Sequence, residues 1–388
     1  MDIRITPKKL SGAVTPPPSK SMAHRYLIAM MLAGQEDTLP AAGESQDISA
    51  TRRCLAALKG TRSGELPHLD CGESGSTLRF LIPIALALTG GGHFTGQGHL
   101  MDRPQQPYFD IFEEKGIAYR RAGSILTVRG TLTAGVYSLP GNVSSQFVTG
   151  LLYALPLLSG DSEIRITSPL ESRGYVDMTL DTLKTFGVNV DNLDYERFRV
   201  PGGQIYRAQD VTVETDWSQA AFWYAALALG SQLELKGLNP FSCQGDMVIV
   251  PHYLRLTQPG DVEIDISECP DLLPPLAVMA AVRSGTTRFI NAARLRIKES
   301  DRLTSVHAML TTLGGRAEEG ADSLTVIGGP LTGGTVDGAN DHRIVMAAAI
   351  AATACTAPVT VLGAEAVSKS YPDFFDVYKQ LGGDFCVL

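Results

Sequence analysis

Hydrophobic residues in this chain gather in six similar segments, each of which starts with polar residues and continues as a nearly unbroken apolar run. Each run is long enough to form a helix, and a helix that is apolar on almost every face is expected inside a protein. We therefore predict six buried helices. The segments are SKSMAHRYLIAMMLAG from Ser19, SGSTLRFLIPIALALTG from Ser74, SSQFVTGLLYALPLLSG from Ser144, SQAAFWYAALALG from Ser218, PDLLPPLAVMAAVRSG from Pro270 and DHRIVMAAAIAATAC from Asp341.

A second pattern recurs with the same spacing: the end of an amphipathic helix, a glycine, and then short strands of alternating polarity. The versions after Gly60 and Gly260 are weaker than the others. The glycines follow one another at intervals of 56, 71, 73, 54 and 68 residues, and the apolar segments at 55, 70, 74, 52 and 71. Two independent markers with one spacing indicate a sequence repeat. The glycines are Gly60, Gly116, Gly187, Gly260, Gly314 and Gly382.

The short intervals fall at the same place in both halves of the series, which indicates that a three-unit domain has been duplicated. Each unit is predicted to contain a strand, a buried helix, a second strand, an amphipathic helix and a hairpin. With 388 residues, of which 44% are hydrophobic, the chain is long enough for two domains with sizeable cores. The fold prediction is an α/β protein of six units, three per domain.

Composition narrows the choice of partner. A formal net charge of -8 argues against nucleic acid and membrane surfaces, because both require a broad excess of positive charge. The six cysteines form no CxxC pair and have no histidine at zinc-finger spacing, so we expect reduced thiols and no metal. The first residues, MDIRITPKKL, contain no apolar signal core, and no apolar run reaches the roughly 20 residues of a membrane span. We expect a cytoplasmic protein that binds anionic ligands in a local cationic pocket.

Polar residues at the helix starts are of kinds that bind anions. A helix start exposes backbone N–H groups and a partial positive charge, so several converging starts would form an anion receptor. Ser and Asp are also the ordinary N-cap residues, and any one start alone is explained by capping. The recurrence of Lys, Arg and His beside the caps favours anion binding. These residues are Lys20, Ser21, Arg25, Ser76, Arg79, Ser144, Ser145, Gln146, His342 and Arg343.

Further charges cluster in turn-like stretches. The stretch RIKESDRL contains Lys298, Glu299 and Arg302, and VSKSYPDFF contains Lys369. In MDRPQQP, Arg103 precedes a proline that stiffens the chain. A charge cluster of this kind is usually a solvated helix face, and the residues alone leave that alternative open.

The motifs SKSMAHR, MDRP, SSQF, RIKESDR, NDHR and SKSYPDFF resemble those of the enolpyruvyl transferase family, specifically its shikimate-phosphate branch. They occur in the family's order and extend from Lys20 to Phe375, so the resemblance covers nearly the whole chain. It implies a two-domain inside-out α/β barrel, with three βαβαββ units per domain and the active site between the domains. The first domain would comprise residues 1–18 and 216–388, and the second residues 19–215.

The resemblance also implies a reaction without a cofactor. The carboxyvinyl group of phosphoenolpyruvate would join the 5-hydroxyl of shikimate 3-phosphate through a tetrahedral adduct that then loses phosphate. We expect a monomer with only these small-molecule partners. Residues implied to bind shikimate 3-phosphate are Lys20, Ser21, Arg25, Ser144, Ser145, Gln146, Ser172, Tyr175, Asp271 and Lys298. Residues implied to bind phosphoenolpyruvate are Lys20, Gly75, Arg103, Gln146, Arg302, Arg343 and Lys369.

Three residues are implied to act in catalysis by proton transfer and charge neutralisation. Asp271 would take the hydroxyl proton, and Glu299 would transfer a proton to and from the vinyl carbon. Lys20 would neutralise the charge of the departing phosphate and is a further candidate proton donor. Asp271 is also placed to cap a helix after Pro270, which is compatible with catalysis. Glu299 could instead only form an ion pair with a neighbouring cation.

Two positions, Glu73 and Arg294, carry charges where the family commonly has asparagine. An uncompensated carboxylate would repel phosphoenolpyruvate. We therefore predict that Glu73 pairs with a cation, for which the candidates are Arg79, Arg103 and Lys369.

Two alternative functions are disfavoured by particular residues. The sister transferase that acts on UDP-N-acetylglucosamine has Asn beside the first lysine and a cysteine-bearing loop, whereas this chain has Ser21 after Lys20 and no cysteine in MDRPQQPYF. A non-catalytic relative that only binds a sugar phosphate would not need both Asp271 and Glu299.

Overall fold

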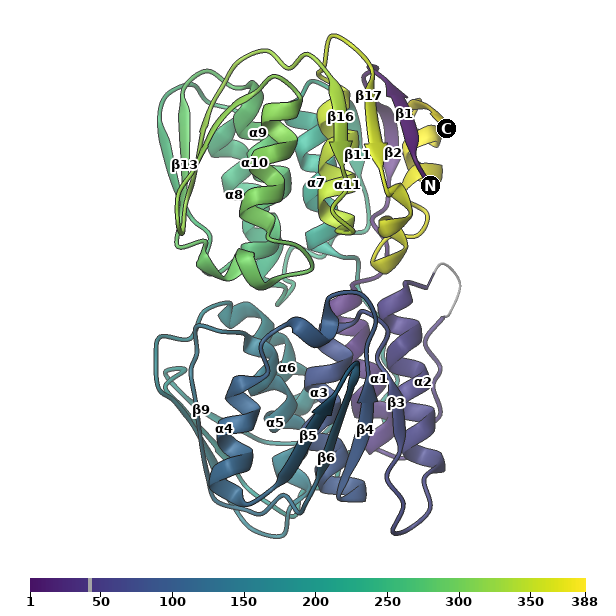
Figure 1. Ribbon diagram of the computed structural model, residues 1–388, viewed down its shortest axis with the longest axis vertical. Helices are drawn as coiled ribbons and strands as arrows, with labels where there is room; N and C mark the ends of the chain where they lie inside the picture. Colours follow the sequence, from purple (N-terminus) through teal and green to yellow (C-terminus); the bar gives the residue numbers. More distant parts are fainter. Residues whose placement is uncertain (41–43) are drawn as a thin grey trace. The chain divides into compact units, whose positions relative to one another are not determined.

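The computed structural model describes residues 1–40 and 44–388, which form two compact units (Figure 1). The first unit comprises Met1–Ser19 and Glu214–Leu388, and the second comprises Lys20–Val213. The chain leaves and re-enters the first unit at one place, because Pro18 and Thr215 form an antiparallel β-bridge there. The first unit is therefore built from both ends of the chain.

Each unit contains three largely buried helices, and these coincide with the six apolar segments. In the second unit they are α1 (Lys20–Leu32), α3 (Gly75–Thr89) and α5 (Ser145–Ala154). In the first unit they are α7 (Trp217–Ala228), α9 (Leu273–Val282) and α11 (His342–Ala352). Every residue of α11 is buried, as its apolar sequence requires. The prediction of six buried helices is confirmed.

Six further α-helices are amphipathic and cover the buried ones. They are α2 (Gln46–Gly60), α4 (Gln106–Lys115), α6 (Arg173–Thr185), α8 (Ile249–Leu256), α10 (Arg302–Thr312) and α12 (Phe374–Gln380). Short 3-10 helices form several connections: η1 (Leu100–Asp102), η2 (Leu155–Leu157), η3 (Gly245–Val248), η4 (Pro270–Leu272), η5 (Ala293–Ile297) and η6 (Ala364–Lys369).

Three four-stranded sheets share one topology, in which the first two strands are parallel and a hairpin adds the fourth strand next to the second. The first sheet has the order β3-β4-β6-β5, with β3 (His68–Asp70), β4 (Gly91–Thr95), β5 (Ala118–Ala122) and β6 (Ile125–Arg129). The second, β7-β8-β10-β9, has β7 (Val136–Leu139), β8 (Ser162–Ile166), β9 (Asp191–Leu193) and β10 (Arg197–Val200). The third, β12-β13-β15-β14, has β12 (Val262–Asp265), β13 (Thr286–Ile290), β14 (Arg316–Glu319) and β15 (Leu324–Ile327).

The last repeat is completed by the start of the chain. Its sheet has the order β16-β17-β1-β18, with β1 (Ile3–Thr6), β16 (Gly334–Asp337), β17 (Val359–Leu362) and β18 (Asp384–Val387). Ile3 pairs with both Val361 and Val387, so β1 takes the place of the missing hairpin strand. A parallel pair of β2 (Ser11–Val14) and β11 (Gln232–Leu235) forms the remaining sheet.

Two repeats have reduced sheets. Within the described ranges, no hairpin follows Gly60 or Gly260, where the sequence pattern is weak. Only the residues 61–67 separate α2 from β3, and a single residue separates Gly260 from β12. These connections are too short for two further strands.

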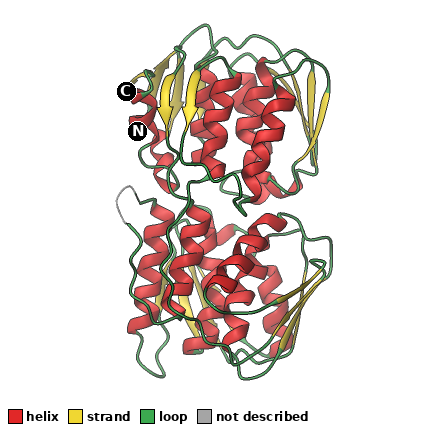
Figure 2. Ribbon diagram, turned by 180° about the vertical axis from the view of Figure 1, so that it is seen from behind, coloured by secondary structure: helices red, strands yellow, loops and turns green. Residues whose placement is uncertain are grey.

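Helices occupy the interior of each unit and strands lie along its outside (Figure 2). Two separate hydrophobic cores result, one in each unit. In the second unit α3 and α5 approach closely at Gly150, where an added Cβ atom would collide with the hydroxyl of Tyr108 and the carbonyl of Arg79. A side chain at Gly150 would therefore force the two helices apart.

Candidate functional site

The starts of α3 and α5 in the second unit are capped and joined by side chains. Ser74 and Ser144 each accept a hydrogen bond from an amide of the first turn, at 3.2 and 3.3 Å. The side chain of Gln146 donates to the hydroxyl of Ser76 at 3.0 Å and accepts from Arg79 at 2.7 Å. The predicted capping by serine is thus present, and Gln146 fixes the two helix starts next to each other.

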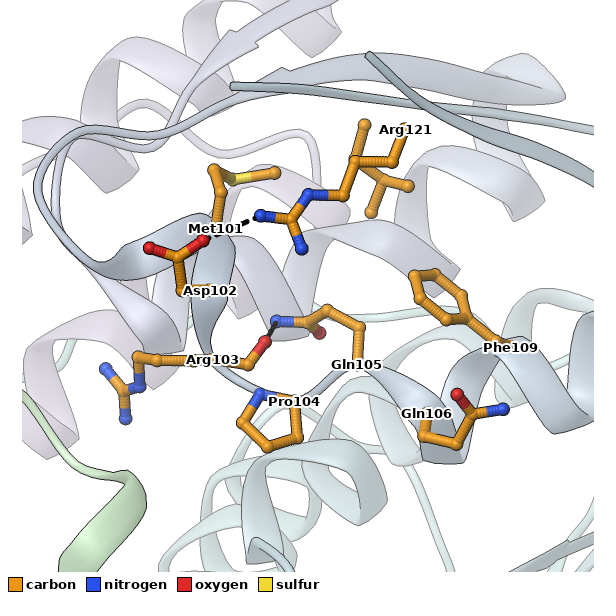
Figure 3. A pocket seen from close by; sticks show the side chains of 9 residues that line it. Met101, Asp102, Arg103, Pro104, Gln105, Gln106, Phe109 and Arg121 are labelled. Carbon is orange, nitrogen blue, oxygen red and sulfur yellow. Dashed lines mark hydrogen bonds and ion pairs between the residues drawn. The ribbon is translucent and has the colours of Figure 1, made fainter. Parts of the chain in front are cut away.

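Arg103 lies against the backbone of Gly75 at the start of α3. A Cβ atom added to Gly75 would lie 2.7 Å from Nη1 of Arg103, so a side chain there would displace the guanidinium. The loop that carries Arg103 borders a cavity of about 220 Å³, which is lined in part by Phe109 and Arg121. Figure 3 shows the Arg103 side chain turned away from Phe109, on the other side of the loop. Arg103 is one of the residues that line the cavity, and its guanidinium lies against Gly75.

Arg25 of α1 bridges to the start of α6. It is 3% exposed and donates to the carbonyl of Tyr175 at 2.7 Å and the hydroxyl of Thr179 at 3.0 Å. It also donates to the carbonyl of Ser21 at 2.6 Å. Ser172, just before α6, has φ of 56°, a left-handed conformation that is uncommon for a residue with a side chain and persists where its surroundings hold it. Arg25, Ser21, Ser172 and Tyr175 therefore gather near one helix end.

Arg302 is the buried centre of an ionic cluster in the first unit. The residue is 1% exposed, and its guanidinium donates to Asp341 at 2.7 Å, Asp271 at 2.8 Å and Glu299 at 2.5 Å. The stretch RIKESDRL is therefore not a solvated helix face. Glu299 does form the ion pair with a neighbouring cation that the residues alone left open, and this pairing does not exclude a role in proton transfer.

Asp271 is contacted by two further cations. Its carboxylate accepts from Arg343 at 2.9 Å and from Lys298 at 3.3 Å, in addition to Arg302. Three cations thus converge on the carboxylate that the resemblance implies to act as the base.

The predicted helix-capping role of Asp271 is wrong. The N-cap residue of α9 is Leu272, and its side chain makes no cap hydrogen bond. A capping side chain normally binds the amides of the second and third helical residues, which here are Pro274 and Pro275 and carry no N–H. Asp271 lies instead within η4, with its carboxylate directed at the cations.

Burial and charge alter the ionisation of this cluster. Burial by itself would lower the pKa of Arg302, but the three carboxylates outweigh burial and raise the pKa. Burial lowers the pKa of Lys298, and the charge of Asp271 opposes that shift. Burial and the charge of Asp271 raise the pKa of Asp246, which is 4% exposed, to about 6. No periodicity or charge cluster in the sequence marks Asp246 as part of this group.

Lys369 lies close to the start of α11, which carries Arg343. It is 4% exposed and donates to the carbonyl of Asn340 at 2.7 Å. Arg294, one of the two departures from the family pattern, donates to the carbonyl of Ser267 at 2.7 Å. Lys369 and Arg343 are thus positioned by one helix start, whereas Arg294 holds a backbone segment.

Glu73, the other departure, packs against Gly98. Its Oε2 atom would lie 2.6 Å from a Cβ atom added there, so the glycine makes room for the carboxylate. The pairing of Glu73 with a cation stays a prediction.

Residues 1–40 and 44–388 lack the features of a metal site, a disulfide or a membrane-spanning helix. No group of three or more His, Cys, Asp or Glu side chains in these ranges is arranged to hold a metal ion. All six cysteines are free thiols. No helix there combines the length and the hydropathy needed to cross a membrane.

Comparison with known proteins decides the family. The family model of EPSP synthase (3-phosphoshikimate 1-carboxyvinyltransferase) matches residues 5–378. The chain belongs to this family. The 3-phosphoshikimate 1-carboxyvinyltransferase of Clostridium kluyveri is 45% identical over 416 residues, which cover 98% of this chain and 97% of the relative. The same enzyme of Clostridium acetobutylicum is 45% identical over 419 residues, with 98% and 97% covered.

Solved structures confirm the fold. EPSP synthase from Acinetobacter baumannii superposes with a TM-score of 0.77 at 22% identity and covers 100% of both chains. The enolpyruvyl transferase NikO from Streptomyces tendae gives a TM-score of 0.75 at 18% identity and covers 99% of this chain and 98% of its own. The predicted inside-out α/β architecture is therefore confirmed, and membership of the EPSP synthase family rests on the sequence matches.

Proposed function

We propose that this chain transfers the carboxyvinyl group of phosphoenolpyruvate to the 5-hydroxyl of shikimate 3-phosphate and releases phosphate. The observation that carries the proposal is the contact of buried Arg302 with the partly buried Asp271 and Glu299, because it joins two candidate acid–base groups to a cation suited to phosphate or carboxylate. The names of the relatives support the shikimate branch and not the UDP-N-acetylglucosamine alternative.

The helix starts of the second unit support binding of shikimate 3-phosphate. Ser144 and Ser145 lie where α5 begins, and a helix start favours a phosphate through its N–H groups and partial positive charge. Arg25, fixed by its contacts with α6, is proposed to bind the carboxylate. Ser21, Gln146, Ser172, Tyr175 and Lys298 complete the proposed set.

The cations of both units support binding of phosphoenolpyruvate. We assign its carboxylate and phosphate to Lys20, Arg103, Arg302, Arg343 and Lys369, with Gly75 giving a backbone contact. Lys369 and Arg343 lie at one helix start of the first unit, and Arg103 lies against Gly75 in the second.

The proton transfers follow from the chemistry of addition and elimination. As the hydroxyl oxygen bonds to C2 of phosphoenolpyruvate, its proton passes to Asp271, and the electron pair of the double bond takes a proton at C3 from Glu299. In the second step C3 returns that proton, the double bond reforms, and the bond from C2 to the phosphate oxygen breaks. Lys20 neutralises the departing phosphate. The departing phosphate takes up one proton and Asp271 releases the one it gained, so the protons balance and the side chains return to their starting states.

The contacts of Asp271 suggest how substrate binding prepares the base. Three cations stabilise its carboxylate and so oppose protonation. Anionic substrates compete for these same cations. Their binding would free Asp271 to accept the hydroxyl proton.

Mass spectrometry of the product tests the proposal. The purified protein should convert shikimate 3-phosphate and phosphoenolpyruvate into the carboxyvinyl ether of the sugar phosphate. A parallel reaction with UDP-N-acetylglucosamine in place of shikimate 3-phosphate should give no carboxyvinyl product. A product only in the second reaction would refute the proposal.

A further inference from the structure

Lys20 occupies an electrostatically unfavourable place. It is the first residue of α1, where the helix carries a partial positive charge that disfavours a cation. Asp47, in the first turn of α2, is at a helix start that favours its carboxylate. The Nζ atom of Lys20 lies 2.8 Å from Oδ2 of Asp47, and the two side chains are only 16% and 13% exposed. Asp47 therefore supplies a shielded counter-charge, unlike a mobile surface pair.

A chain of buried hydrogen bonds fixes α2 against its neighbours. Nδ1 of His24 in α1 lies 2.7 Å from the hydroxyl of Thr51 in α2, which lies 2.7 Å from the hydroxyl of Thr77 in α3. Thr77 donates in turn to the hydroxyl of Ser74 at 2.8 Å. All four residues are 1% exposed or less. One continuous chain thus links three helices close to their starts.

These hydrogen bonds limit where Asp47 can lie. The hydroxyls of Thr51 and Thr77 lie 3.4 and 3.5 Å from the backbone carbonyl of Asp47 itself. A shift of α2 would break buried hydrogen bonds that water cannot replace. The chain also ends at Ser74, the residue before Gly75. The carboxylate that holds Lys20 is therefore fixed relative to the start of α3.

We propose that Asp47 is a positioning residue for Lys20, held in place by the hydroxyls of Thr51 and Thr77. Asp47 itself contacts neither substrate. Its carboxylate keeps the Lys20 ammonium in one orientation. The Lys20 side chain then loses little conformational entropy when the ammonium contacts the departing phosphate. The inference rests on the proposed function, which gives Lys20 its part in the reaction.

Steady-state kinetics of three variants give the first test. Asp47→Asn keeps the size of the side chain and removes its charge, and should lower kcat by about 10- to 100-fold while the protein stays folded. Asp47→Glu restores the carboxylate and should recover most of the lost rate. Glu36→Gln is the matched control. Glu36 forms a solvent-exposed ion pair with Lys59, in the last turn of α2, with 3.2 Å between Oε1 and Nζ. The variant should keep the wild-type kcat.

A double-mutant cycle separates positioning from a general structural effect. If Asp47 acts through Lys20, the variant with both Lys20→Ala and Asp47→Asn should be no slower than Lys20→Ala alone. Losses that multiply, an unchanged kcat in Asp47→Asn, or a Glu variant as slow as the Asn variant would each overturn the proposal.

Chemical labelling gives a readout that does not depend on activity. An amine-reactive reagent, with peptide mass spectrometry, should modify Lys20 faster in Asp47→Asn than in wild type, and Glu36→Gln should leave the Lys20 rate unchanged. Equal Lys20 labelling in wild type and Asp47→Asn would contradict the positioning role. If Lys20 is labelled faster in Asp47→Asn but the wild-type protein forms no carboxyvinyl product, the proposed function is refuted while the contact between Asp47 and Lys20 is supported.

Discussion

At the scale of single residues, one arginine determines the arrangement of the candidate acid–base groups. Arg302 is buried and its three donor positions hold Asp271, Glu299 and Asp341. The family resemblance singled out Arg302, Asp271 and Glu299, but the sequence could not show that the guanidinium of Arg302 joins the two carboxylates to Asp341. It also missed Asp246, because burial and a distant carboxylate, not its neighbours in sequence, set its ionisation.

The two carboxylates can be tested by removing their charge. Asp271→Asn and Glu299→Gln should each lower kcat by about 100-fold or more, since a positioned acid–base group typically contributes on that scale. The amides keep the shape, so calorimetry should still detect binding of shikimate 3-phosphate. Asp301→Asn is the control, because Asp301 is a partly exposed cap of α10 in the same motif as Glu299 and Asn caps equally well. Full turnover in either amide variant would remove that residue from the mechanism.

A buried histidine should make stability depend on pH. Burial, and then the charges of Lys20 and Arg25, hold the pKa of His24 well below its usual value. Below about pH 6.5, His24 is protonated in the unfolded chain but stays neutral in the folded protein. The free energy of unfolding therefore falls as pH falls, by up to about 1.4 kcal/mol per pH unit.

Urea unfolding between pH 7.5 and 5.5 measures this dependence. His24→Asn removes the titrating group and keeps a polar atom near Thr51, so its loss of stability over that range should be smaller than that of wild type. Parallel curves for the two proteins would show that His24 does not contribute.

At the scale of elements, the local pattern predicts helices well and strand partners poorly. The buried helices follow from apolar runs such as that of α11, whose burial is complete. The pairing of β1 with β17 and β18 joins residues from opposite ends of the chain, which no local pattern can indicate. The hairpins expected after Gly60 and Gly260 are absent from the described residues, because the connections there are too short.

The crossing of α3 and α5 depends on a glycine. Gly150→Ala should destabilise the protein by about 1–3 kcal/mol, because the new methyl group collides with Tyr108 and the backbone of Arg79. Gly60→Ala, at the end of α2, is the matched control: nothing lies within 4 Å of the added Cβ, so its stability should be unchanged or slightly raised. Equal unfolding free energies for the two variants would mean that the crossing tolerates a side chain.

At the scale of the whole molecule, each unit has its own hydrophobic core, which contains three buried helices. The units then differ in what they carry. The second supplies serines and cations at helix starts, whereas the first supplies the carboxylate cluster with Arg302. The net charge of -8 does not prevent binding of anionic substrates, because the cations are concentrated locally. The period and the motifs can be identified in the sequence, whereas the ion pairs are visible only in the structure.

Release of inorganic phosphate, with each substrate omitted in turn, tests the central claim most directly. The account predicts release only when shikimate 3-phosphate and phosphoenolpyruvate are both present, at a rate that a chelator does not change and that Lys20→Ala lowers. Release from phosphoenolpyruvate alone, or with UDP-N-acetylglucosamine in place of shikimate 3-phosphate, would contradict the proposed transfer reaction.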